Sequence, residues 1–236
     1  MIAWIGRFRF VTVALVAERF GVSVQMTGRR LARLEAGGLL VRARLTHADP
    51  FVVFLTPAGA RRVGLAARRA PRVGVQREHE LAIAWLTSRL ERTTDHLVVT
   101  ERECRAWQLR EEGRFSVRLY RPVGRGDRVR WPDLVVTGNG RRVAVEIEFA
   151  PKGSARLAAI VHGYLHSGLY DEVRFLLSHP ATAGRLVGIA GRERARAGTL
   201  MSGEGTQIVL SPWPGCTPGD RALVQAAIDD AAVERR

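Results

Sequence analysis

Three acidic residues and the only lysine of the 236-residue chain lie close together along one predicted hairpin. An Asn-Gly pair at residues 139–140 separates the β-rich runs WPDLVV and RRVAVEIEF, and this pair favours a two-residue type I′ turn. With the pair at the centre of the turn, Asp133 lies directly opposite Glu146, and the strand period of two adds Glu148 to the same face. We therefore expect three carboxylates at one patch of sheet, with Lys152 four residues beyond Glu148.

Carboxylates gathered in this way suit a metal-dependent reaction. Asp133, Glu146 and Glu148 supply three oxygen ligands with no Cys or His set nearby, a combination that favours Mg²⁺ or Mn²⁺ over zinc. Such a site can hold a phosphate-bound metal and generate a hydroxide for phosphodiester hydrolysis, with Lys152 stabilising charge on the phosphate or orienting water. The alternative is a surface strand whose acids form ion pairs with arginines of the same region, namely Arg141, Arg142 or Arg156.

A mixed sheet must hold this hairpin in place. Short apolar runs alternate with helical patterns from residue 77 onward, which predicts an α/β sandwich. On the second strand of the hairpin, four apolar residues face away from the acids: Val143, Val145, Ile147 and Phe149. No element is predicted for the polar stretch of residues 105–129. The expected helices are 77–92, 153–167, 181–197 and 219–234, and the expected strands are HLVVTE, WPDLVV, RRVAVEIEF, EVRFLLS and TQIVLS.

The basic residues define a second candidate site, because their charge is concentrated in the first third of the chain. The whole chain has 37 Lys plus Arg against 23 Asp plus Glu, a net charge of +14, and residues 1–75 contain 13 Arg against 3 acids. A segment this basic attracts a polyanion, either nucleic acid or an anionic membrane surface. Nucleic acid is favoured, since no Trp/Phe-rich amphipathic stripe accompanies the arginines.

Local signals in this segment predict two helices joined by a tight turn. Thr12 can cap a helix over residues 13–20, Gly21 ends it, and Ser23 can cap a second helix that runs to the glycines at 37–38. Two β-rich runs, LLVRARL and FVVFL, follow as a hairpin.

The second of these helices has a core face and an exposed face. Four of its residues recur at helical spacing and should face the core: Val24, Thr27, Leu31 and Leu34. That arrangement turns five others outward: Gln25, Met26, Arg29, Arg30 and Arg33.

The order of helix, turn, helix, hairpin and LTPAG resembles the winged helix-turn-helix family of DNA-binding domains. The resemblance implies that the second helix enters the major groove of double-stranded DNA, with Gln25, Arg29 and Arg30 near base edges or phosphates. Arg33 belongs to the same outward face. The resemblance also places two hairpin residues against the DNA backbone or minor groove, Arg42 and Arg44. The alternative is a protein-interaction domain whose arginines form a solvated face.

The spacing WPD-x12-EIE-x3-K resembles the PD-(D/E)xK nuclease superfamily, whose core is helix, three strands, helix, strand. In that superfamily the Asp after Pro and the acid of the next strand bind the metal, which carries over onto Asp133 and Glu146. The position usually taken by Lys is Glu148 here, so the resemblance makes Lys152 its substitute. An assisting acid near the first helix has two candidates, Glu101 and Glu80.

The pairing of this core with an N-terminal winged helix, together with the segment EIEFAPKGSARLAAIVHGYLHSG, resembles the replication-relaxation family of plasmid and integrative-element proteins over most of the chain, about residues 5–210. The resemblance implies a winged helix-turn-helix joined to a PD-(D/E)xK-like mixed-sheet α/β domain, serving replication, transfer or transcriptional control of a mobile element. Two functions stay open: a DNA-binding protein whose nuclease fold is a scaffold, and a Mg²⁺- or Mn²⁺-dependent endonuclease. The expected boundaries are 1–72, 73–212 and 213–236, the last a C-terminal helical extension.

Other features narrow the expected partners. Cys104 and Cys216 lie far apart with no CxxC pattern, which predicts a reducing, cytoplasmic compartment. We expect no membrane partner, because no run of about 18 apolar residues occurs. We expect no nucleotide cofactor, because GRGDR lacks the GxxxxGK[ST] pattern. A palindromic DNA site would imply a two-fold dimer, so a homodimer stays open.

Overall fold

The computed structural model describes residues 1–44, 50–66, 77–119, 128–150, 152–198 and 205–233. The chain divides into two compact units, Met1–Asp95 and His96–Arg236. Each unit contains both helices and strands, so the mixed α/β character predicted from the sequence is confirmed.

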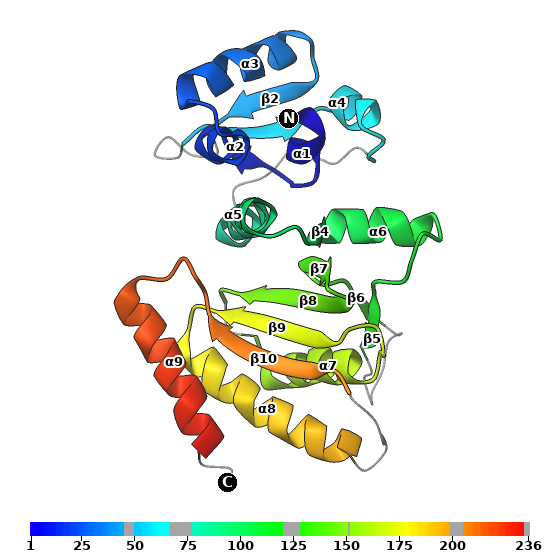
Figure 1. Cartoon of the computed structure of the whole chain (residues 1–236), viewed down its shortest axis with the longest axis vertical. Coiled ribbons are helices and arrows are strands. Elements are labelled where there is room, and N and C mark those ends of the chain that lie inside the picture. The colour runs from blue at the N-terminus through cyan, green and yellow to red at the C-terminus, as the bar shows by residue number, and fades with distance from the viewer. Residues whose placement is uncertain (45–49, 67–76, 120–127, 151, 199–204, 234–236) are drawn as a thin grey trace. The chain divides into compact units, whose positions relative to one another are not determined.

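The first unit combines short helices with a small antiparallel sheet (Figure 1). Its elements are α1 (Ile2–Gly6), β1 (Val11–Thr12), α2 (Val13–Phe20), α3 (Val24–Ala36), β2 (Leu40–Ala43), β3 (Val52–Leu55), α4 (Pro57–Arg62) and α5 (Arg77–Thr93). The strands form a sheet of order β1-β3-β2, in which the β2–β3 pair is the hairpin expected after the second helix.

Side-chain caps begin both helices of the predicted helix-turn-helix. The Thr12 hydroxyl accepts a hydrogen bond from the backbone N–H of Leu15 at 3.2 Å, and the Ser23 hydroxyl accepts one from Met26 at 3.2 Å. Between the helices Gly21 has a φ of 60°, a left-handed conformation that glycine adopts without strain. The local sequence therefore determines where α2 ends and where α3 begins.

Helix α3 contacts the core of its unit only from its second turn onward. Thr27 and Leu31 are fully buried and Leu34 is partly buried, as the helical spacing predicts. Val24 is 56% exposed, so its predicted place in the core is wrong. The physical reason is its position as the first helical residue after the Ser23 cap, one turn before the helix meets the core.

Helix α5 belongs to the first unit, whereas the expected boundary near residue 72 assigned it to the second. Its residue Glu91 accepts hydrogen bonds from Trp4 Nε1 at 3.0 Å and from Arg19 Nε at 2.8 Å, and it also pairs with Arg7. Burial of this carboxylate raises its pKa, but the hydrogen bonds and charges of these partners outweigh burial and hold the pKa below its usual value. The polar face of α5 thus fastens it to α1 and α2.

The second unit is built on a five-stranded mixed sheet. Its elements are β4 (Leu97–Thr100), α6 (Glu101–Leu109), β5 (Val117–Leu119), β6 (Arg128–Arg130), β7 (Leu134–Gly138), β8 (Arg141–Glu148), α7 (Ser154–Leu165), β9 (Glu172–Leu177), α8 (Pro180–Gly198), β10 (Gln207–Pro212) and α9 (Pro218–Val233). The strand order is β10-β9-β8-β7-β4; β8, β9 and β10 are parallel, and β7 is antiparallel to β8 and β4. β5 and β6 form a separate antiparallel pair.

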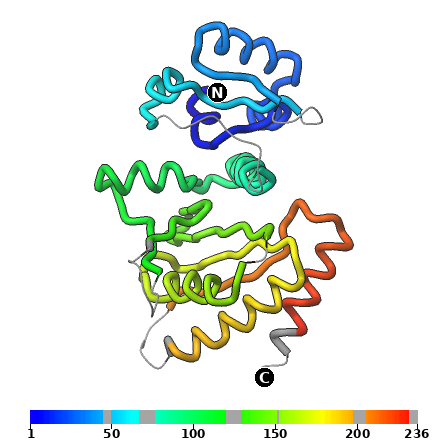
Figure 2. Tube along the Cα trace, turned by 180° about the vertical axis from the view of Figure 1, so that it is seen from behind, coloured from blue at the N-terminus to red at the C-terminus, as the bar shows by residue number. Residues whose placement is uncertain are grey.

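Helices α7 and α8 pack on the same face of this sheet (Figures 1 and 2). Leu157 and Val161 of α7 belong to one buried cluster with Phe175 and Leu177 of β9. Helix α9 lies against α8, and its Val224 is fully buried in the same cluster. The C-terminal helix expected from the sequence is therefore part of the core of the second unit.

One helix, α6, and one pair of strands, β5 and β6, lie in or overlap the polar stretch for which the sequence predicted no element. Helix α6 begins at a capping box, in which the Thr100 hydroxyl accepts from the Glu103 backbone N–H and the Glu103 carboxylate accepts from the Thr100 backbone N–H. The β5–β6 pair carries Arg130 at the end of β6, beside the hairpin acids. A high proportion of charged residues hides the periodicity of the helix and of the two strands in the sequence.

Candidate functional site

The hairpin of β7 and β8 has the register predicted from its turn. Asn139 and Gly140 have φ values of 52° and 72°, the left-handed conformations that a type I′ turn requires. β7 and β8 then pair so that Asp133, one residue before β7, comes opposite Glu146. Asp133, Glu146 and Glu148 are 3%, 0% and 2% exposed, so these acids lie inside the second unit and the alternative of a surface strand does not hold.

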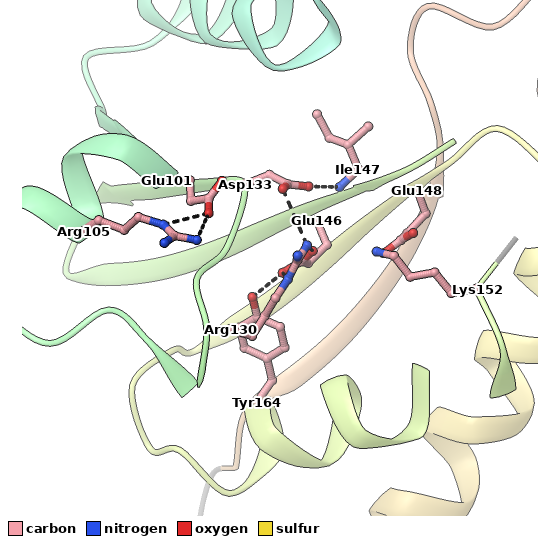
Figure 3. A network of polar contacts seen from close by, with 9 residues as sticks. All are labelled: Glu101, Arg105, Arg130, Asp133, Glu146, Ile147, Glu148, Lys152 and Tyr164. Carbon is pink, nitrogen blue, oxygen red and sulfur yellow. Dashed lines mark hydrogen bonds and ion pairs between the residues drawn. The ribbon is translucent and has the colours of Figure 1, made fainter. Parts of the chain in front are cut away.

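Arg130 lies between two of these acids (Figure 3). Its Nε donates to Glu146 Oε1 at 3.2 Å, its Nη2 bonds Glu146 Oε2, and the same Nη2 lies 3.6 Å from Asp133 Oδ1. The charge of Glu146 raises the pKa of Arg130 despite partial burial. The guanidinium is therefore a fixed cation beside both carboxylates, and its single positive charge can offset only one of theirs.

Tyr164 of α7 donates its hydroxyl to Glu146 Oε1 (Figure 3). The ring is fully buried. Burial first, and then the neighbouring carboxylate, raise the Tyr164 pKa well above its usual value, so the phenol stays protonated and donates. On the other side of the pair, Asp133 Oδ2 accepts from the backbone N–H of Ile147 at 2.8 Å. Donors from β6, α7 and β8 thus surround the two acids.

Glu148 has a different partner. It forms an ion pair with Lys152, whose side chain is largely buried. Figure 3 shows Lys152 reaching Glu148 rather than Asp133 or Glu146. Burial raises the pKa of Glu148, Lys152 lowers it less, and the charges of Glu146 and Asp133 raise it further. The lone lysine thus lies beside the acids, as predicted, but the contact that it makes is with Glu148.

The arrangement does not fit the metal site expected from the sequence. Among the residues that the structure describes, no three His, Cys, Asp or Glu side chains are grouped so that they could hold a metal ion. Asp133 and Glu146 face Arg130, and Glu148 faces Lys152. Each of the three carboxylates expected to bind Mg²⁺ or Mn²⁺ therefore already has a side-chain cation beside it, and we assign no catalytic step to such a metal.

Neither candidate for an assisting acid joins this group. Glu101, at the start of α6, accepts from Arg105 Nε at 2.9 Å one helical turn away. Glu80 belongs to the first unit, where its carboxylate lies 3.8 Å from Arg9. The role that the nuclease resemblance gave to either acid has no support in these contacts.

The exposed face of α3 forms a separate candidate site, which we call the α3 face and define by Gln25, Met26, Arg29, Arg30 and Arg33. All five side chains are exposed, as the helical spacing predicts. Within the described part of the chain, no acidic side chain pairs with any of the three arginines. Their positive charge is therefore available to an external anion.

The two hairpin arginines make contacts within the unit. Arg42 donates from Nε to Glu35 at 2.6 Å, and its backbone N–H also bonds Glu35, which lowers the pKa of that carboxyl. The Arg44 guanidinium lies 4.8 Å from the centroid of the Phe51 ring. The Arg42 side chain is thus paired with Glu35 of α3. The winged helix resemblance instead placed Arg42 against the DNA backbone or minor groove.

The family described as replication-relaxation matches residues 2–166, which is more than half of the chain. The chain belongs to the replication-relaxation family. Membership indicates a role in replication or in the processes of mobile elements. No curated protein and no solved structure matches the chain.

The replication-relaxation match covers both candidate sites. It includes the α3 face and extends to residue 166, just past Tyr164. Arg130, Asp133, Glu146 and Tyr164 therefore all lie inside the match. In the described part of this family member, no helix is long and apolar enough to cross a membrane.

Two side chains that contact the buried acids were not predicted from the sequence, Arg130 and Tyr164. Tyr164 continues the stripe Leu157, Ile160, Val161 at helical spacing, which is a signal that its ring faces the sheet. Arg130 stands three residues before Asp133, but no local pattern distinguishes it from the other arginines of a polar stretch. The position of Arg130 depends on the pairing of β6 with β5, in which Arg130 lies opposite Val117.

Proposed function

We propose that this protein binds double-stranded DNA through the α3 face, in the replication, transfer or transcriptional control of a mobile element. The first unit has the element order of a winged helix-turn-helix, in which the second helix enters the major groove. The observation that carries the proposal is the set of exposed arginines on α3 that lack acidic partners among the described residues. Family membership supports the same process.

The α3 arginines differ from several other arginines of the first unit, which pair with acids. Several arginines of the first unit have an acidic partner within that unit: Arg7 and Arg19 with Glu91, Arg9 with Glu80, Arg42 with Glu35, and Arg92 with Glu18. The positive charges of those arginines are thus largely offset by acids of the same unit. The arginines of the α3 face have no acidic partner among the described residues. Phosphates are the natural partner for a row of arginines on one helix.

We propose further that the second unit serves as a scaffold rather than as a nuclease. Arg130 occupies the space between Asp133 and Glu146, and Lys152 neutralises Glu148. A hydrolytic metal would need those same oxygens. The internal ion pairs therefore support a structural role for the acids.

DNA binding is tested by titrating duplex DNA at several salt concentrations. We expect Arg29→Ala and Arg30→Ala each to weaken binding and to reduce the slope of log K against log[salt] by about one for each lost phosphate contact. Arg192→Ala is a matched control, because Arg192 is an exposed arginine of α8 in the second unit. Slopes that match wild type in both α3 variants would rule out the proposed docking.

The scaffold role is tested by incubating supercoiled plasmid with the full chain in Mg²⁺ or Mn²⁺. We expect wild type to nick no faster than Asp133→Ala, because no group of three His, Cys, Asp or Glu side chains among the described residues could hold a metal ion. Asp220→Ala, at an exposed acid at the start of α9, controls for contaminating nuclease and for nonspecific effects of removing an acid. Nicking by wild type and Asp220→Ala that is lost in Asp133→Ala would establish the endonuclease instead.

A further inference from the structure

The buried acids of the second unit have the geometry of a cation site in which the cation is a side chain. Asp133 precedes β7 and Glu146 lies on β8, yet both carboxylates converge on one nitrogen, Arg130 Nη2. That nitrogen bonds Glu146 directly and lies 3.6 Å from Asp133 Oδ1. Arg130 comes from β6, outside the five-stranded sheet that carries the acids.

Charge and burial explain why a cation is needed there. Two carboxylates that face each other across a strand pair repel unless something positive lies between them. The Tyr164 hydroxyl and the Ile147 backbone N–H donate hydrogen bonds but bring no charge. Arg130 supplies the positive charge, and its side chain keeps 23% of its surface exposed, so the position can be reached from solvent.

We propose that Arg130 is the resident cation of this carboxylate pair, so that wild type takes up no Mg²⁺ or Mn²⁺ there and a variant without the guanidinium does. A pair of carboxylates is a suitable set of protein ligands for a divalent ion that keeps several of its waters, as Mg²⁺ usually does. The carboxylates of Asp133 and Glu146 would hold that hydrated ion. The inference concerns the second unit and does not depend on DNA binding by the first.

Thermal unfolding of the full chain in MgCl₂ or MnCl₂, against NaCl of equal ionic strength, tests the proposal without any enzymatic readout. Wild type should unfold at the same temperature in all three salts. Arg130→Gln should unfold at a lower temperature in NaCl and rise by about 5 °C in Mn²⁺ at saturating concentration. The double variant Arg130→Gln/Glu146→Gln lacks one carboxylate and should not respond to Mn²⁺.

Two results would overturn the proposal. The first is a Mn²⁺-dependent rise for wild type that Asp133→Asn abolishes, because the pair would then bind metal with Arg130 present. The second is a rise for Arg130→Gln no larger than that of the double variant, because the arginine would then fill no cation position. If Arg130→Gln is unfolded in NaCl, far-UV circular dichroism replaces the midpoint: folding on addition of Mn²⁺ supports the proposal, and continued unfolding contradicts it.

Discussion

Side-chain donors take the place of water around the buried Glu146 carboxylate. Arg130 donates to both carboxylate oxygens, and the Tyr164 hydroxyl donates to one of them. A buried ion pair gains little stability over apolar packing, but the loss of one partner is costly because a buried charge then lacks compensation. Each donor to Glu146 should therefore be more important to stability than an ordinary hydrogen bond of the same unit.

The chain offers a matched pair of tyrosines for this comparison. Tyr164→Phe removes a donor to a carboxylate, whereas Tyr170→Phe removes a donor to the backbone carbonyl of Phe115. We expect losses in the free energy of unfolding of about 2 kcal/mol for Tyr164→Phe and about 1 kcal/mol for Tyr170→Phe, because hydrogen bonds to charged groups are the stronger. Urea unfolding of the full chain measures both. A loss for Tyr164→Phe no larger than that for Tyr170→Phe would show that Arg130 alone satisfies Glu146.

The same residues show what the sequence can predict. The Asn-Gly turn is local, so the opposition of Asp133 and Glu146 follows from the sequence and is confirmed. Which cation lies between the acids depends on a pairing of β5 with β6, and charged residues mask that pairing in the sequence. The metal expectation was drawn from the carboxylates alone: spacing identifies which carboxylates meet but does not identify the cationic side chain that lies beside them.

At the scale of elements, helix α5 shows that contacts with residues distant in the sequence can place a helix in one unit rather than in the next. Pro71 and Gly74 indicate a break in the sequence, and α5 follows that break. The structure nevertheless assigns α5 to the first unit, where Glu91 binds Trp4, Arg7 and Arg19. The sequence predicts the helix itself from its periodicity, but its partners lie more than 70 residues earlier in the chain, beyond the reach of any local signal.

This fastening should be sensitive to acid. The folded-state pKa of Glu91 is lowered, so its contribution to stability is full above the unfolded pKa of about 4.3 and is lost as pH falls through the folded pKa. Near neutral pH we expect Glu91→Gln to cost on the order of 2 kcal/mol, and we expect its stability to fall less on acidification than that of wild type. Urea unfolding at several pH values measures both effects.

Glu18→Gln provides the control for Glu91→Gln. Glu18 also links α2 to α5, through an ion pair with Arg92, but both of these side chains are about half exposed. Exposed pairs contribute about 0.5 kcal/mol, so the control should stay close to wild type. Equal losses in the two variants would mean that burial of Glu91 adds nothing to the attachment of α5.

For the whole molecule, the division of charge follows the two units. Residues 1–95 contain 16 arginines against 7 acids, a balance of +9, and residues 96–236 contain 21 basic residues against 16 acids, a balance of +5. The second unit is longer, so its charge per residue is much lower. If long-range attraction to DNA follows this density, the first unit should account for most of the salt dependence of binding.

A fragment of residues 1–95 tests this division, because it keeps the compact unit with its own buried residues, among them Ile5, Leu31 and Val53. We expect its slope of log K against log[salt] on duplex DNA to lie within about one of that of the full chain, since each phosphate contact changes the slope by about one. Arg29→Ala/Arg30→Ala in the fragment is the control and should lower the slope by about two. A fragment slope lower than that of the full chain by two or more would place phosphate contacts on the second unit, and DNA recognition would then belong to both units.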